Sequence, residues 1–189
     1  MIQGIIPFAH DLLAKAVTRG DTVVDATCGN GNDTLFLSSL VGDEGHVFAV
    51  DIQRQAIQTT KALLAEHTRK NFTLIHDSHA HIDTYIDDHV ELAAAVFNLG
   101  YLPRSDKQII TEPTSTITAL EKLLHRIRLS GLVILVVYSG HPGGQEEKDA
   151  LLRYVRALSQ KTYKVLQYEF VNLQNNPPFV LAIEKIADN

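Results

Sequence analysis

The chain has 189 residues, of which 45% are hydrophobic and 21% are charged, as is usual for a globular protein with a sizeable core. At this length we expect a single domain spanning residues 1–189. The formal net charge of −5 argues against a broad surface that coats nucleic acid, although a local basic patch can still read a small folded RNA. The one cysteine excludes an internal disulfide, and no apolar run is long enough for a signal peptide or a membrane span. We therefore expect a cytoplasmic protein with no membrane partner.

Hydrophobic periodicity predicts helices and strands that alternate along the chain. The helices are expected at residues 7–17, 34–40, 53–66, 114–128 and 145–159. The strands are expected at residues 23–25, 45–51, 72–76, 92–99, 131–138, 163–171 and 179–186. The segment between the last two strands suits an antiparallel connection better than a helical crossover. The expected fold is an α/β, Rossmann-like sheet of seven strands, mostly parallel, with a C-terminal antiparallel pair and helices on both faces.

The turn after the first strand is the segment around which the chain is organised. Asp25 ends the strand, and Gly29 and Gly31 follow in a loop of small residues that leads at once into a helix. Glycine at these positions lets the backbone turn with positive φ and lets a ligand approach closely. Asn32 or Asp33 is the expected N-cap of the helix. The order of strand, glycine turn and helix is typical of a βαβ nucleotide site.

The details of this turn disfavour a dinucleotide. Thr34 stands where a third glycine would complete the dinucleotide motif, and Asp33 is a poor neighbour for a pyrophosphate. An acid four residues before the first glycine, with a second acid, Asp51, at the end of the next strand, instead resembles motif I of the S-adenosylmethionine (SAM) methyltransferases. A carboxylate at Asp51 can accept hydrogen bonds from both hydroxyls of a ribose.

In open α/β sheets, ligands bind beyond the carboxyl ends of the strands, and polar or glycine-rich sequence follows each of these ends. Residues 77–79 can hydrogen-bond an adenine edge or cap the following turn, and both roles stay open. The residues expected to bind SAM, S-adenosyl-L-methionine, are Asp25, Gly29, Asn30, Gly31, Asn32, Asp51, Gln53, Asp77, Ser78 and His79.

The end of the fourth strand is the expected acceptor site. Asn98-Leu99-Gly100-Tyr101-Leu102-Pro103 resembles the Asn/Asp-Pro-Pro-Tyr motif of methyltransferases that act on exocyclic amines, with Leu-Gly in place of Pro-Pro. In that motif the side-chain amide holds the amine and the aromatic ring packs on the base. A simple turn after a core strand is the alternative.

We expect Asn98 and Tyr101 to be catalytic, and His141 either to take a proton or only to hold its loop. The residues expected to contact the acceptor substrate are Tyr138, Gly140, Arg104 and Lys107, the last two through phosphates.

The cysteine and the loop histidines could in principle be a nucleophile and metal ligands, but the sequence favours neither role. Cys28 lies inside the glycine loop, where a small residue is needed, and no histidine or acid is obviously placed to activate it as a nucleophile. The histidines of the loops lack a matching carboxylate or cysteine pattern, so we expect no metal site. They are His76, His79, His81 and His89.

Six segments together resemble the small bacterial class I SAM methyltransferases formerly labelled "putative rRNA methylase". They are residues 25–34, 49–53, 77–79, 97–103, 137–144 and 175–179. The most specific are residues 98–103 and Gly140-His141-Pro142-Gly143-Gly144. The resemblance implies methyl transfer from SAM to the 5-aminomethyl group of a modified wobble uridine, 5-aminomethyl-2-thiouridine, with the tRNA anticodon stem-loop as partner.

Several alternatives stay open at this point. An rRNA or small-molecule methyltransferase would share the SAM site and differ only in the acceptor pocket. A non-catalytic Rossmann module that binds a nucleotide is the alternative from another class. The chain could also act as a homodimer.

Overall fold

The computed structural model describes residues 1–100 and 113–188. Tyr101, Arg104 and Lys107 therefore lie outside the described residues. The helices are α1 (Ile5–Ala16), α2 (Asn32–Val41), α3 (Arg54–Glu66), the 3₁₀ helix η1 (His79–Tyr85), α4 (Pro113–Arg126) and α5 (Gly144–Ala157). The strands are β1 (Thr22–Asp25), β2 (His46–Asp51), β3 (Phe72–His76), β4 (Leu92–Leu99), β5 (Ile127–Val137), β6 (Tyr163–Tyr168) and β7 (Phe179–Lys185).

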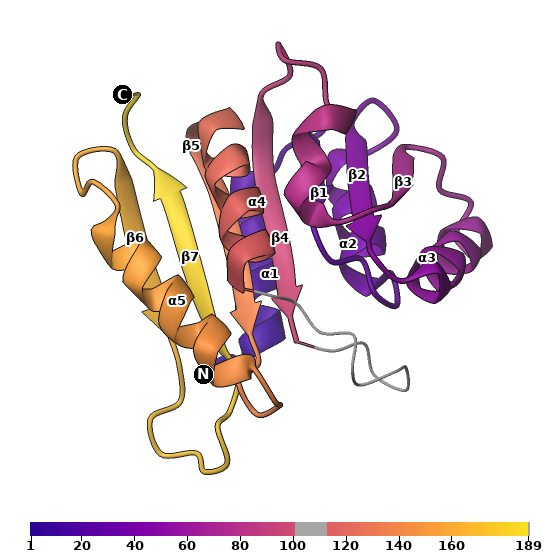
Figure 1. Cartoon of the computed structure of the whole chain (residues 1–189). Helices are drawn as coiled ribbons and strands as arrows, with labels where there is room; N and C mark the ends of the chain where they lie inside the picture. Colours follow the sequence, from indigo (N-terminus) through magenta and orange to yellow (C-terminus); the bar gives the residue numbers. More distant parts are fainter. Residues whose placement is uncertain (101–112, 189) are drawn as a thin grey trace.

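All seven strands belong to one sheet, in the order β3-β2-β1-β4-β5-β7-β6. The pairs from β3 to β5 are parallel, whereas β7 is antiparallel to both β5 and β6. The predicted seven-stranded sheet with an antiparallel C-terminal pair is confirmed. The parallel strands end along one edge of the sheet, which also carries the connection between β6 and β7 (Figure 1).

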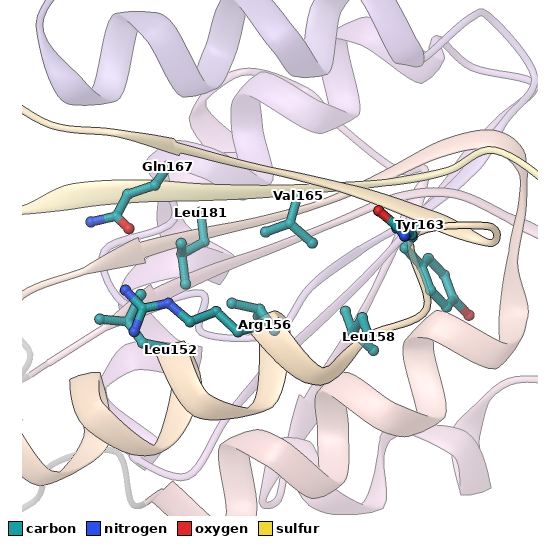
Figure 2. A pocket seen from close by; sticks show the side chains of 9 residues that line it. Leu152, Arg156, Leu158, Tyr163, Val165, Gln167 and Leu181 are labelled. Atoms are coloured by element: carbon teal, nitrogen blue, oxygen red, sulfur yellow. The ribbon is translucent and has the colours of Figure 1, made fainter.

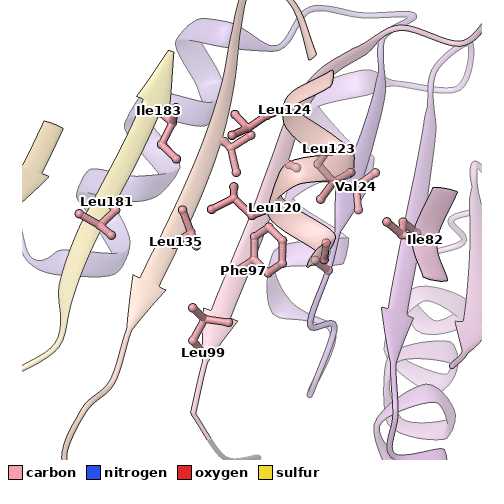
Figure 3. Packing of buried hydrophobic residues seen from close by; sticks show 14 of the residues in the cluster. Val24, Ile82, Phe97, Leu99, Leu120, Leu123, Leu124, Leu135, Leu181 and Ile183 are labelled. Carbon is pink, nitrogen blue, oxygen red and sulfur yellow. The ribbon is translucent and has the colours of Figure 1, made fainter. Parts of the chain in front are cut away.

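Helices cover both faces of the sheet (Figure 1). On one face, the apolar stripe of α4 packs on β4 and β5, and Leu120, Leu123 and Leu124 share one core cluster with Phe97 and Leu135 (Figure 3). The other face packs against α1 and α2. The central strands are buried on both faces, which explains why β4 and β5 are nearly continuous apolar runs in the sequence. No helix in the described ranges is long and apolar enough to cross a membrane.

The boundary between α4 and β5 differs from the prediction. Helical spacing placed Ile127 on the apolar face of a helix, but α4 ends at Arg126 and Ile127 is the first residue of β5, paired with Leu92 of β4. The ladder then shifts register before it resumes, and Ser130 has φ of 61° within the irregular stretch. A buried apolar residue such as Ile127 suits both the last turn of a helix and the start of a strand, so periodicity alone could not distinguish the two.

Candidate active site

The glycine loop after β1 has the backbone that the sequence predicts. The φ angles are 51° at Gly29 and 84° at Gly31, both in the left-handed region. A Cβ atom built on Gly31 would lie 2.9 Å from the Cα of Thr60 in α3, closer than real Cβ atoms approach. Glycine is therefore needed at position 31 both for its φ and for the close approach of α3.

The cap of α2 differs from the prediction. Gly31 is itself the N-cap, with no side-chain hydrogen bond to the first turn, so the expectation of a cap at Asn32 or Asp33 is wrong. The left-handed turn at Gly31 brings the chain into α2 early enough that both residues belong to its first turn. Asn30 and Asn32 are exposed on the loop, where a ligand can reach them.

Asp51 ties the end of β2 to the glycine loop. Its Oδ2 accepts a hydrogen bond from the backbone N–H of Gly29 at 3.0 Å, and its Oδ1 accepts one from the N–H of Gln53 at 2.8 Å. Burial raises the pKa of Asp51, and these two backbone bonds act in the opposite direction. A carboxylate offers about four acceptor positions, so about two remain for ribose hydroxyls. Gln53, the N-cap of α3, is half-buried beside it.

Replacing Asp51 by alanine is expected to weaken SAM binding without unfolding the protein. Hydrogen bonds to a charged group contribute about 1.5–3 kcal/mol each, so the loss of one or two lowers the affinity by at least about tenfold. Isothermal calorimetry with SAM measures the change. Asp43→Ala, which removes an exposed acid from the turn before β2, is the matched control. Equal affinities for the two variants would show that the ribose is held elsewhere.

Asp25 lies beneath the loop and is completely buried. Its carboxylate accepts hydrogen bonds from the Thr34 hydroxyl at 2.6 Å and from the Thr27 N–H at 3.2 Å. Asp25 therefore stabilises the conformation of the glycine loop through Thr27 and Thr34. Its contact with SAM stays a prediction.

The ionisation of Asp25 makes stability depend on pH. Burial, followed by the nearby charge of Asp33, raises the pKa of Asp25 from 3.8 to about 7. The unfolded chain ionises this group near pH 4 while the folded chain keeps the proton, so stability declines as the pH rises from about 4 to about 7. The free energy of unfolding, measured with urea at pH 5 and at pH 7.5, should fall between these pH values for the wild type. The fall should be larger than that of Asp25→Asn by on the order of 1–3 kcal/mol. Parallel pH profiles for the two proteins would contradict this assignment.

Residues 77–79 show the capping role that the sequence left open. Ser78 is the N-cap of η1, and its hydroxyl accepts a hydrogen bond from the Ala80 N–H. Asp77 accepts hydrogen bonds from the Ser78 N–H at 2.7 Å, from His81 Nδ1 at 3.0 Å and from the Tyr85 hydroxyl at 2.8 Å. The contact of Asp77 and Ser78 with an adenine stays a prediction.

His79 is buried between the loop and the core. Its Nδ1 lies 3.2 Å from the carbonyl oxygen of Ala26, and its ring contacts the edge of Phe97. Burial lowers the pKa of His79, so the ring is neutral and donates from Nδ1. Among the described residues its Nε2 has no hydrogen-bond partner. His79 therefore supports the strand that carries the glycine loop, and its contact with SAM stays a prediction.

Cys28 is buried in the glycine loop. Burial, followed by the charges of Asp25 and Asp51, raises the pKa of its thiol far above neutrality, so Cys28 is no nucleophile. Among the described residues, no three His, Cys, Asp or Glu side chains gather in a group that could hold a metal ion.

Asp33 is the centre of a polar cluster that sequence reasoning did not find, and we call it the Asp33 cluster: His10, Asp33 and Asn98. His10 Nε2 of α1 lies 2.6 Å from Asp33 Oδ1, and the Asn98 side-chain amide of β4 donates to Asp33 Oδ2. The backbone N–H of Asn98 also donates to the Thr27 hydroxyl at 2.6 Å. The end of β4 is thus fastened to the loop after β1 and to the start of α2.

The loop after β5 completes the same edge. The backbone N–H of Tyr138 donates to the Leu99 carbonyl at 3.1 Å, and the Tyr138 Cβ lies 3.3 Å from where a Cβ on Gly100 would be. Burial, followed by the charge of Asp33, raises the pKa of Tyr138. The predicted catalytic residue Asn98 therefore contacts Asp33, and the charge of Asp33 also acts on the predicted substrate residue Tyr138.

His141 and Gly140 lie on the loop between β5 and α5. His141 Nδ1 is 3.0 Å from the Pro142 carbonyl, and its Nε2 lies 3.0 Å from where a Cβ on Gly144 would be. Gly140 is exposed and faces the Asn176 backbone of the connection between β6 and β7. His141 therefore contacts its own loop, and whether it also takes a proton stays a prediction.

A cavity of about 310 Å³ lies elsewhere, between α5 and the strands β6 and β7 (Figure 2). It is lined by apolar side chains together with a few polar ones, Arg156 and Gln167 among them. None of the predicted site residues lines it. The predicted site residues that the structure describes instead gather at the carboxyl ends of the parallel strands.

Comparison with known proteins identifies the family of the chain. Residues 47–184 match the model of a family described as "Putative rRNA methylase". A chloroplastic tRNA (mnm(5)s(2)U34)-methyltransferase of Arabidopsis thaliana is 34% identical over 186 residues, which cover 94% of this chain and 68% of the relative.

Two crystal structures are similar to the chain over nearly their whole length. A protein of the same rRNA-methylase description from Clostridium thermocellum is 44% identical with a TM-score of 0.95, covering 98% of this chain and 100% of that one. A methyltransferase from Streptococcus mutans, solved in complex with SAH, is 41% identical with a TM-score of 0.90 and the same coverage. The predictions of the fold and of SAM as cofactor are confirmed. The chain belongs to the rRNA methylase family of class I SAM-dependent methyltransferases.

Proposed function

We propose that this methyltransferase transfers the methyl group of SAM to the 5-aminomethyl group of a modified wobble uridine in tRNA. The observation that carries the proposal is the 34% identity, over 94% of the chain, to a relative named as a methyltransferase of this nucleoside. The geometry supports an amine acceptor, because the Asn98 amide contacts the Asp33 carboxylate beside the glycine loop and the charge of Asp33 acts on Tyr138.

The acceptor amine has to lose a proton before it can react. An alkylammonium resembles a lysine side chain, with a reference pKa of about 10.4, so it is mostly protonated at neutral pH. When bound, SAM supplies a methyl group on a positively charged sulfur. The positive charge of bound SAM beside the amine would lower the pKa of the amine, since a like charge disfavours the charged form. Asn98 then has its side-chain carbonyl oxygen available for the amine, because its Nδ2 is engaged with Asp33. Alignment of the reacting atoms contributes up to about 7–11 kcal/mol in well-oriented systems.

RNA recognition is expected to be local and limited to the anticodon stem-loop. A wobble base is already in a loop, so it can be splayed into a pocket more readily than a base in a duplex. Arg104 and Lys107 remain the proposed phosphate contacts and lie outside the described residues. The net charge of −5 fits a small contact area. The reaction is proposed to occur in the cytoplasm, and a homodimer remains compatible with it.

An rRNA acceptor is the second candidate, because the family description names rRNA. The experiment that separates the two uses labelled methyl transfer from SAM to synthetic anticodon stem-loops with and without the 5-aminomethyl group, and to ribosomal RNA. We expect label only in the aminomethyl stem-loop, with a rate that falls as salt is added, since phosphate contacts release counterions. Equal labelling of both stem-loops, or labelling of ribosomal RNA alone, would contradict the proposal.

A further inference from the structure

Both oxygens of the Asp33 carboxylate are held by side chains from other elements. His10 binds Oδ1 and Asn98 binds Oδ2, and the ring of His10 is stacked on Phe36 with centroids 4.0 Å apart. An acid in the first turn of a helix is explained by the helix dipole alone. That explanation does not account for two partners, 23 and 65 residues away in the sequence, converging on one carboxylate.

The position of this carboxylate is also specific. Asp33 follows the glycine loop by two residues, its partner Asn98 begins the acceptor motif, and its charge acts on Tyr138. The Asp33 side chain is 11% exposed, so the group is oriented but can still be reached from the edge of the sheet. A carboxylate with about four acceptor positions keeps some of them for a ligand.

We infer that Asp33 is a catalytic residue that receives the acceptor amine, and that His10 is a positioning residue that holds its carboxylate. The inference rests on the proposed function, which supplies an amine as acceptor. An ammonium group carries three N–H donors and a positive charge, and a partly buried carboxylate binds it by charge-assisted hydrogen bonds. A neutral acceptor group of the same size would gain much less from this site.

The proton balance of the reaction follows from this assignment. One N–H proton of the ammonium passes to an Asp33 oxygen, which frees the nitrogen lone pair. That lone pair forms the bond to the methyl carbon as the carbon–sulfur bond breaks, and its electron pair stays on sulfur, which leaves SAH. The methylated nitrogen departs as a cation, and Asp33 returns its proton to water. Charge and atoms balance without a further reactant.

The test is a double-mutant cycle on binding, with SAH present so that no turnover occurs. Two stem-loops differ only in an aminomethyl or a hydroxymethyl group at the wobble uridine, and their affinities are measured with wild type and with Asp33→Asn. We expect the wild type to prefer the aminomethyl stem-loop by about tenfold or more, and Asp33→Asn to lose the preference. Asp11→Asn is the control, since it removes the same charge from an exposed pair with Lys15 on α1. It should keep the preference.

The possible outcomes are distinct. The inference is wrong if Asp33→Asn still prefers the aminomethyl stem-loop. It is also wrong if the wild type methylates the aminomethyl stem-loop but binds both stem-loops equally well. Either result leaves the proposed function intact. A wild type that neither prefers nor methylates the aminomethyl stem-loop overturns both. Thermal unfolding shows whether Asp33→Asn folds. If it does not, Asp33→Ser takes its place in the binding test.

The role of His10 is tested by a matched pair of substitutions. His10→Phe keeps the stacking on Phe36 but removes the contact with Asp33, whereas His10→Gln restores an N–H donor. We expect the preference for the aminomethyl stem-loop to fall in the first variant and to be largely recovered in the second. Equal preferences in both variants would show that His10 does not position Asp33.

Discussion

Replacing Asn98 by alanine is expected to lower turnover by about 100-fold, the loss that follows when a reacting group is misplaced by about 1 Å. The side-chain amide is the only part of Asn98 removed, because its backbone N–H keeps the bond to the Thr27 hydroxyl and β4 stays in place. Without that amide, Asp33 loses the partner of one carboxylate oxygen and the acceptor loses a hydrogen-bond acceptor. The proposed SAM site, on the loop after β1 and on Asp51, is left intact.

Single-turnover rates at saturating SAM and stem-loop, together with calorimetric SAM affinity, measure this effect. Gln160→Ala removes an exposed side-chain amide just before β6, at the opposite end of the strands, and it should keep wild-type rates. If Asn98→Ala lost SAM affinity but kept its rate per bound SAM, the assignment of Asn98 to the acceptor would be wrong.

The second large effect is expected for Gly31→Ala, which should destabilise the fold and abolish measurable SAM binding. A left-handed conformation costs an alanine about 1–2 kcal/mol. The added methyl group would also lie 2.9 Å from the Thr60 Cα, and such overpacking costs about 1–3 kcal/mol. The total of about 2–5 kcal/mol is a large part of the stability of an ordinary domain. Relief requires that α3 and the loop move apart, which displaces the Gly29 contact with Asp51.

Gly20→Ala separates the two causes. Gly20 has φ of 88°, close to that of Gly31, but a Cβ there would meet nothing within 4 Å. The Gly20→Ala variant should lose only about 1–2 kcal/mol of unfolding free energy, measured with urea, and should bind SAM with wild-type affinity. Similar stability and SAM affinity for the two variants would mean that the close approach of α3 does not matter.

The strands could be predicted because each buried strand of the sheet is a short run of apolar residues in the sequence. The bounds of β3 and β4 are those expected from the sequence, since each apolar run is bracketed by polar residues. The glycine loop was predictable for a similar reason, as only glycine fits the backbone there. By contrast, η1 has no periodic pattern of its own, and the position of Ile127 depends on its pairing with β4 across the sheet.

The Asp33 cluster could not be predicted from the sequence because it depends on three separate elements. His10 lies on a helix that precedes the sheet, and it reaches Asp33 only because α1 packs back across the sheet. Nothing in the spacing of residues 10, 33 and 98 signals that contact. Asp25 shows the converse case, since its motif was recognised but complete burial gives it a supporting role.

The most direct test of the central claim is the identity of the methylated nucleoside. Total tRNA and ribosomal RNA from a strain that lacks this gene are incubated with the protein and SAM, digested to nucleosides and analysed by mass spectrometry. The proposed function predicts that the 5-aminomethyl wobble nucleoside disappears from tRNA and that its N-methylated form appears in equal amount. Methylation of a different nucleoside, or of ribosomal RNA alone, would contradict it.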